Sequence, residues 1–117
     1  MTQHDDTVAL RHMLDYAYTA RRLADGRTRA DLDTDEMLQL ALTRAVEVIG
    51  EAARRVSEEG RNIYAQIPWR AITGTRDRLI HGYDQVNPDI LWRIVAQELP
   101  PLITELERIL DAEDSDQ

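Results

Sequence analysis

Apolar residues recur at helical spacing along most of this 117-residue chain, and that periodicity limits the possible folds more than any other feature. We find no convincing alternation of apolar and polar residues of the kind that marks a half-buried strand. The hydrophobic fraction of 43% is that of a folded protein, and the length suits one hydrophobic core. The sequence therefore predicts an all-α fold with a single domain over residues 1–117, ending in a frayed acidic tail at 112–117.

Two long helices are expected in the first half of the chain. The first runs from about Asp6 to Ala24, and Asp25–Asp33 is expected to be a loop. The second begins near Thr34, after a capping box formed by Asp33 and Glu36, and Ser57–Gly60 ends it. Its apolar stripe is wider than one face of a surface helix requires, so a second side is available to a second subunit.

Two further helices complete an expected antiparallel bundle of four main helices. The third is predicted from about Pro68 to His81, with Gly82 just past its end and Gly74 as a point where it could kink or break. The fourth begins at Asn87-Pro88, a cap followed by a first helical residue. Its apolar phase continues past Pro100-Pro101, so these prolines must kink or split it.

Composition and charge exclude several functional classes. The chain has no cysteine, which excludes disulfides, thiolate metal sites and a cysteine nucleophile. His4 and His12 are not at metal-ligand spacing, and we expect neither a metal nor a cofactor. The net charge of −8 argues against a broad electrostatic grip on nucleic acid, although a local cleft built from the arginines is compatible with it. With no signal-peptide pattern and no apolar run of about 20 residues, we expect a cytoplasmic protein without a membrane segment.

The third helix contains the candidate site. Arg76 is expected on the same stripe as Trp69 and Ile80, where an arginine is costly unless it is paired, faces a cleft or extends its head group to water. The spacing favours none of these alternatives. His81 follows five residues later, about 140° around an ideal helix, so the two side chains do not share a face. A site that uses both must form where the helix ends or across two chains.

Asp77 lies four residues before His81 and shares its face of the helix. Its carboxylate could fix the imidazole tautomer and favour the protonated ring, and the helix C-terminus acts in the same direction. Both effects suit a histidine that accepts and donates protons near neutral pH. The structural alternative is a histidine that caps the last helical turn.

Two further groups of residues have weaker interpretations. Glu47 and Glu51 have i, i+4 spacing, and with Arg44, Arg54 and Arg55 nearby they indicate a solvated or ion-paired surface rather than a carboxylate site. Aromatic residues that could stack on RNA bases are few, and the candidates are Tyr64, Trp69 and Tyr83.

The pattern Arg-x4-His-x-Tyr, formed by Arg76, His81 and Tyr83, has a chance expectation on the order of 0.01 matches in a chain of this composition. It resembles the motif of HepT-like toxins in the HEPN superfamily. Three other stretches are similar to that family and extend the resemblance over nearly the whole chain: Ala45–Ala52, Asn87–Trp92 and Leu99–Leu102.

This resemblance implies the toxin component of a type VII-like toxin–antitoxin system, a homodimeric and metal-independent endoribonuclease. His81 would act as general base or acid on the 2′-hydroxyl or the leaving oxygen, and Arg76 would hold the scissile phosphate. Asp77 would orient the site, and Arg78 would bind phosphate and RNA. Family members have been linked to transfer RNA.

The resemblance also implies a partner, a minimal nucleotidyltransferase antitoxin that silences the toxin by transferring AMP onto the motif tyrosine, here Tyr83. The added phosphate would compete with RNA for the arginines. The alternative from a different class is a non-catalytic helical adaptor, which would dimerise and bind the same nucleotidyltransferase.

Overall fold

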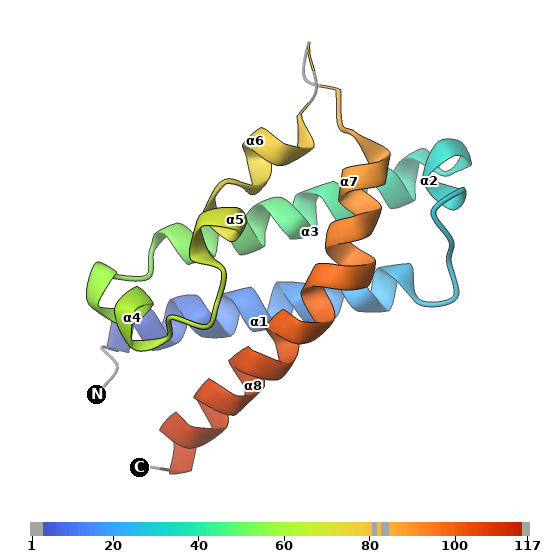
Figure 1. Cartoon of the computed structure of the whole chain (residues 1–117). Helices are drawn as coiled ribbons and strands as arrows, with labels where there is room; N and C mark the ends of the chain where they lie inside the picture. The colour runs from blue at the N-terminus through green and yellow to red at the C-terminus, as the bar shows by residue number, and fades with distance from the viewer. Residues whose placement is uncertain (1–3, 81, 83–84, 116–117) are drawn as a thin grey trace.

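Three long helical stretches form the frame of the molecule (Figure 1). The computed structural model describes residues 4–80, 82 and 85–115. In chain order the helices are α1 (His4–Ala24), α2 (Asp31–Thr34), α3 (Glu36–Arg54), α4 (Glu58–Ile63), α5 (Trp69–Thr73), α6 (Thr75–Leu79), α7 (Pro88–Arg93), the π-helical segment η1 (Ile94–Glu98) and α8 (Leu99–Ser115). The described residues include no β-strand, and the all-α prediction is confirmed.

The core lies where the long helices meet. α1 and α3 pack along each other, and the continuous stretch α7–η1–α8 crosses α1 (Figure 1). Each of the three contributes an apolar stripe at helical spacing, as the periodicity predicted. The largest fully buried side chains are Leu10, Met13, Leu42, Val46, Leu79, Leu91, Val95, Leu106 and Ile109. No helix in the described ranges has both the length and the apolar character needed to cross a bilayer.

The start of α3 differs from the predicted capping box. Asp35, in an extended conformation, is the cap, and its carboxylate accepts a hydrogen bond of 3.0 Å from the backbone N–H of Leu38. The preceding residues form the short helix α2, so the predicted loop Asp25–Asp33 was wrong at its last three positions. Gly26, at φ +72°, ends α1 in the left-handed conformation that favours glycine.

Ser57 begins a helix and does not end one, which corrects the predicted end of α3. Its hydroxyl accepts a hydrogen bond of 3.0 Å from the N–H of Gly60 and thereby caps α4. The buried carboxylate of Asp6 accepts two hydrogen bonds from Ser57, from the N–H at 2.8 Å and from the hydroxyl at 2.6 Å. This contact fastens α4 to the first turn of α1, a long-range interaction that local spacing does not reveal.

Replacement of Asp6 by alanine is expected to lower the free energy of unfolding by about 1–3 kcal/mol. The change leaves two donors of the partly buried Ser57 without their acceptor, and a donor left unsatisfied away from water costs about that much. Urea denaturation measures the effect. The matched control is Asp5→Ala, an exposed neighbour in the same helical turn. Equal stability of the two variants would contradict this role of Asp6.

The predicted third helix, Pro68–His81, is two short helices, α5 and α6, with a break at Gly74. The sequence marked this glycine as a point where the helix could kink or break, and the junction approaches α3 closely. A Cβ on Gly50 would lie 3.0 Å from the carbonyl oxygen of Ile72, so the absence of a side chain lets the α5–α6 junction rest on α3. The Thr75 hydroxyl donates to the same carbonyl at 2.6 Å. α6 ends at Leu79 because Ile80 is extended.

The last helical stretch begins as predicted, since the Asn87 side chain accepts hydrogen bonds from the N–H groups of Asp89 and Ile90. Its irregularity is η1, which precedes Pro100-Pro101. Neither proline has an N–H, and the N–H of the residue before them bonds to the carbonyl of Ile94, five residues back.

The π-helical turn leaves the carbonyl of Val95 free of its helical partners, because Leu99 already donates elsewhere and Pro100 has no N–H. The guanidinium of Arg21 on α1 donates a hydrogen bond to this carbonyl, with Nη1 3.1 Å from the oxygen. The prolines therefore distort the turn before them, while α8 itself runs regularly to Ser115, so residues 112–115 are helical.

Candidate active site

Arg76 lies on the outer surface of α6. The break at Gly74 separates α6 from α5, so the stripe expected to join Trp69, Arg76 and Ile80 does not form, and Arg76 is exposed. Its side chain lines a depression of about 80 Å³ between α6 and α3. Within the described residues its guanidinium has no carboxylate partner. Of the alternatives left open by the sequence, a cleft position describes Arg76 best.

The α3 side of this depression is formed by Glu47, Gly50, Glu51 and Arg54, which lie on one face at i, i+3, i+4 and i+7. Thr73 and Thr75 complete the lining. Glu51 forms an exposed ion pair of 3.3 Å with Arg44, in agreement with the predicted solvated or ion-paired surface. That interpretation missed that the same face of α3 borders Arg76. The signal that could have found it is Gly50, a glycine inside a long helix that marks a close approach.

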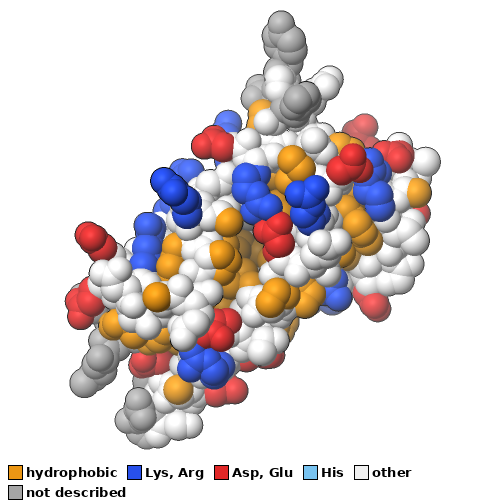
Figure 2. Space-filling view, in the orientation of Figure 1, with side chains coloured by type: hydrophobic (Ala, Val, Ile, Leu, Met, Phe, Trp, Pro, Cys, Tyr) orange, Lys and Arg blue, Asp and Glu red, His pale blue; other side chains and the backbone are white. Residues whose placement is uncertain are grey.

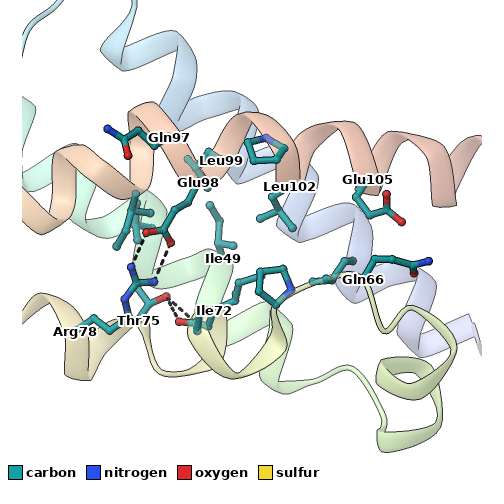
Figure 3. A pocket seen from close by; sticks show the side chains of 16 residues that line it. Ile49, Gln66, Ile72, Thr75, Arg78, Gln97, Glu98, Leu99, Leu102 and Glu105 are labelled. Atoms are coloured by element: carbon teal, nitrogen blue, oxygen red, sulfur yellow. Dashed lines mark hydrogen bonds and ion pairs between the residues drawn. The ribbon is translucent and has the colours of Figure 1, made fainter.

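Arg78 points away from this depression. Two residues apart on a helix correspond to about 200°, so Arg76 and Arg78 project from opposite sides of α6. Arg78 makes a bidentate ion pair with Glu98 of η1, with Nη1–Oε1 at 2.9 Å and Nη2–Oε2 at 2.6 Å (Figure 3). The hydrogen bonds to Glu98 raise the pKa of the guanidinium. The structure therefore does not bring Arg78 together with Arg76, and sequence reasoning missed Glu98 entirely.

The Arg78–Glu98 pair stands at the edge of a cavity of about 580 Å³. Its walls are mainly apolar and come from α3, α5, η1 and α8, and Figure 3 shows Gln66 and Glu105 at the end away from the ion pair. Figure 2 shows the hollow in the middle of this face, with hydrophobic side chains at its floor and charged groups at its edge. The apolar lining includes Ile49, Ile67, Ile72, Ile94, Leu99 and Leu102.

Two of the predicted site residues, His81 and Tyr83, lie outside the described residues. The structure does describe the base of the segment that contains them. Ile80 and Val86 form an isolated antiparallel bridge, and the N–H of Asn87 donates to the carbonyl of Leu79 at 2.8 Å. Asp77 is exposed. Of the predicted site residues, Arg76 and Asp77 therefore lie on α6, and the described residues on either side of the connection to α7 are hydrogen-bonded to each other.

The aromatic candidates on the described part of the chain have structural roles. The indole N–H of Trp69 donates to the carbonyl of Tyr64 at 3.0 Å, and the hydroxyl of Tyr64 donates to Glu113 at 3.0 Å. Burial, together with this carboxylate, raises the pKa of Tyr64 to about 12. Neither ring lines the depression of Arg76. Among the described residues, no group of three or more His, Asp or Glu side chains is arranged to hold a metal ion.

Comparison with known proteins identifies the family. The model of the ribonuclease HepT-like family matches residues 13–109. A candidate RNase of Caldanaerobacter subterraneus subsp. tengcongensis is 35% identical over 104 residues, which cover 89% of this chain and 93% of that protein. A candidate RNase of Methanocaldococcus jannaschii is 42% identical over 84 residues, covering 71% and 69%. The probable ribonuclease HepT of Thermococcus cleftensis is 35% identical over 79 residues, covering 68% and 72%.

No solved structure gives a significant match. The family match begins within α1, ends within α8 and includes the whole stretch from Arg76 to Tyr83. The chain belongs to the ribonuclease HepT-like family.

Proposed function

We propose that this chain is a metal-independent endoribonuclease and the toxin of a type VII-like toxin–antitoxin pair. One observation carries the proposal: the family match includes the entire Arg76-x4-His81-x-Tyr83 motif. The exposed position of Arg76, in a depression and without a carboxylate partner among the described residues, supports it. Transfer RNA is the substrate class that the family resemblance favours.

The proposed reaction uses the RNA as its own nucleophile. His81 accepts the proton of the 2′-hydroxyl while that oxygen attacks the adjacent phosphorus, and the bond from phosphorus to the 5′-oxygen breaks. The leaving 5′-oxygen takes up a proton from water, giving a 2′,3′-cyclic phosphate and a 5′-hydroxyl, and His81 later returns its proton to the solvent. Arg76 holds the phosphate and offsets the charge that develops on its oxygens. Asp77 orients His81.

A symmetric homodimer is part of the proposal, and α3 offers the surface for it. Met37 and Leu40 on its outer face are 82% and 60% exposed, the most exposed large apolar side chains of the described residues. The same face continues through Arg44 to Glu47 and Glu51, which border the depression of Arg76. A second copy on this face would bring two such depressions next to one another.

Leu40→Asp is therefore expected to convert a dimer into a monomer of 13.5 kDa and to abolish RNA cleavage. A carboxylate at an apolar contact loses its hydration without gaining a partner. Analytical ultracentrifugation gives the mass. The control is Ile63→Asp, which changes an exposed apolar residue of α4. A Leu40→Asp protein that stays dimeric would place the interface elsewhere.

The proposed antitoxin is a minimal nucleotidyltransferase that transfers AMP from ATP to the phenolic oxygen of Tyr83, with release of pyrophosphate. The test compares growth of cells that express the wild type, His81→Ala or Tyr83→Phe, with and without a nucleotidyltransferase encoded next to this gene. The partner should rescue growth with the wild type and leave a mass increase of one AMP on Tyr83. Rescue of Tyr83→Phe, or an unmodified tyrosine after rescue, would remove AMP transfer from the account.

A non-catalytic adaptor is the second candidate function, and the exposed Met37 and Leu40 of α3 favour it, because exposed apolar side chains can contact a partner protein. The cavity of about 580 Å³ has the size of a small-molecule site and does not distinguish the two functions. An adaptor would bind the nucleotidyltransferase without cleaving RNA. Equal growth of cells expressing the wild type and His81→Ala, together with the absence of cleavage by both purified proteins, would favour the adaptor.

A further inference from the structure

We infer that Arg54 is a second phosphate-binding residue of the Arg76 site and contacts the RNA backbone beside the scissile phosphate. The inference rests on the proposed ribonuclease function and adds a residue outside the Arg-x4-His-x-Tyr motif. Arg54 is in the last turn of α3, 22 positions before Arg76, and both side chains line the same depression.

The guanidinium of Arg54 is held in one orientation by a neutral group. Its Nε and Nη2 atoms both donate to the carbonyl oxygen of Thr73, at 3.2 Å and 3.0 Å. These bonds use two of its five N–H donors and leave the others available. Because the acceptor is a carbonyl and Arg54 has no carboxylate partner among the described residues, its positive charge is not cancelled by a salt bridge. A fixed, unneutralised arginine fork suits a phosphate.

The charge around the depression is favourable although the chain is acidic overall. Two glutamates, Glu47 and Glu51, border it together with Arg54 and Arg76. Glu51 is held by Arg44 at 3.3 Å, so three arginines face two glutamates on this patch. The surrounding acidic surface does not prevent local binding, because charges beyond about 8–10 Å are screened at physiological ionic strength.

Gly50 allows Arg54 and Arg76 to line the same depression. It lies on the same face of α3 as Arg54, one turn earlier, and a Cβ there would be 3.0 Å from the carbonyl of Ile72. This close approach puts the end of α5, with the Thr73 carbonyl that orients Arg54, beside α3. The start of α6, with Arg76, follows directly. The face of α3 thus supplies one arginine and the space for the helix that supplies the other.

The test compares RNA cleavage by Arg54→Ala, Arg54→Gln and the matched control Arg55→Ala. Arg55 is the adjacent exposed arginine, and its Nη2 lies 2.9 Å from Nδ1 of His12, away from the depression. We expect kcat/KM to fall about 10- to 100-fold for both Arg54 variants, the value of one hydrogen-bonded charge contact, and to change less than twofold for Arg55→Ala. Glutamine keeps a donor for the Thr73 carbonyl, so wild-type activity in Arg54→Gln would reduce Arg54 to a structural role and overturn the inference.

RNA binding in the His81→Ala background separates this inference from the proposed function. Affinity for a single-stranded RNA is measured by fluorescence anisotropy over a range of salt concentrations. Loss of one phosphate contact should reduce the slope of log K against log salt by about 0.7 in Arg54→Ala and leave it unchanged in Arg55→Ala. If the wild type cleaves RNA but the salt-dependence slopes of Arg54→Ala and Arg55→Ala are equal, the role of Arg54 is overturned and the proposed ribonuclease function is unaffected. If the wild type neither cleaves nor binds RNA, both the role of Arg54 and the proposed ribonuclease function are overturned.

Discussion

Replacement of Arg76 by alanine should lower kcat/KM for RNA cleavage by about 10²- to 10³-fold, the cost of removing one preorganised donor to transition-state charge. Arg76 is exposed on α6, so the folded structure loses no buried contact and unfolding should be unaffected within about 0.5 kcal/mol. Lysine should restore activity in part, because it keeps the charge and loses the planar fork. Initial rates on a short RNA, with a thermal unfolding curve for each variant, give both quantities.

The control for Arg76 is Arg70→Ala. Arg70 is an exposed arginine of α5, so its removal changes the net charge by the same amount. It does not line the depression that contains Arg76. We expect its activity to remain within twofold of the wild type. Equal loss of activity in both variants would mean that Arg76 acts through general electrostatics, and full activity of folded Arg76→Ala would exclude it from catalysis.

The second large effect is expected for Leu79→Ala, which should lower the free energy of unfolding by about 2–5 kcal/mol. Leu79 is completely buried, and it anchors a helix of five residues that is too short to be stable by itself. Its carbonyl also receives the N–H of Asn87, which closes the connection after α6. A loss of this size is a large fraction of the 5–15 kcal/mol that stabilises a typical domain.

Urea denaturation of Leu79→Ala and Leu79→Met measures this contribution. Methionine nearly fills the same volume and should cost less than about 1.5 kcal/mol. Because α6 contains Arg76, we also expect Leu79→Ala to lose RNA cleavage at temperatures where Leu79→Met keeps it. A Leu79→Ala protein as stable as the wild type would show that α6 does not depend on this anchor.

The long helices were predictable because their apolar positions repeat with the helical period over many turns. Asn87-Pro88 was also predictable, since a side-chain cap and a following proline are local signals. The position of the break in the third helix was also indicated locally, by Gly74, but the packing of the broken helix depends on contacts between distant residues. It needs the absence of a side chain at Gly50 on α3, 22 residues before the carbonyl of Ile72 that approaches it. Ser57 is a similar case, because its partner Asp6 is 51 residues away.

The candidate site likewise contains residues that the sequence could identify and residues that only the tertiary packing reveals. Arg76, as part of a spaced motif, could be found from the sequence, and the structure places it in a depression. Arg54 could not, because it meets Arg76 through the packing of α3 against the α5–α6 junction. The proposed RNA contact of Arg78 is opposed by its ion pair with Glu98, 20 residues later, where no local pattern predicts a partner.

The Arg76–His81 motif is proposed to cleave RNA without a metal. The most direct test incubates purified wild type and His81→Ala with transfer RNA in the presence of EDTA and identifies the new ends. We expect cleavage by the wild type with 2′,3′-cyclic phosphate and 5′-hydroxyl ends, and a rate at least about 10²-fold lower for His81→Ala. Cleavage at the same rate by both proteins, or activity that disappears with EDTA and returns with a divalent metal, would contradict it.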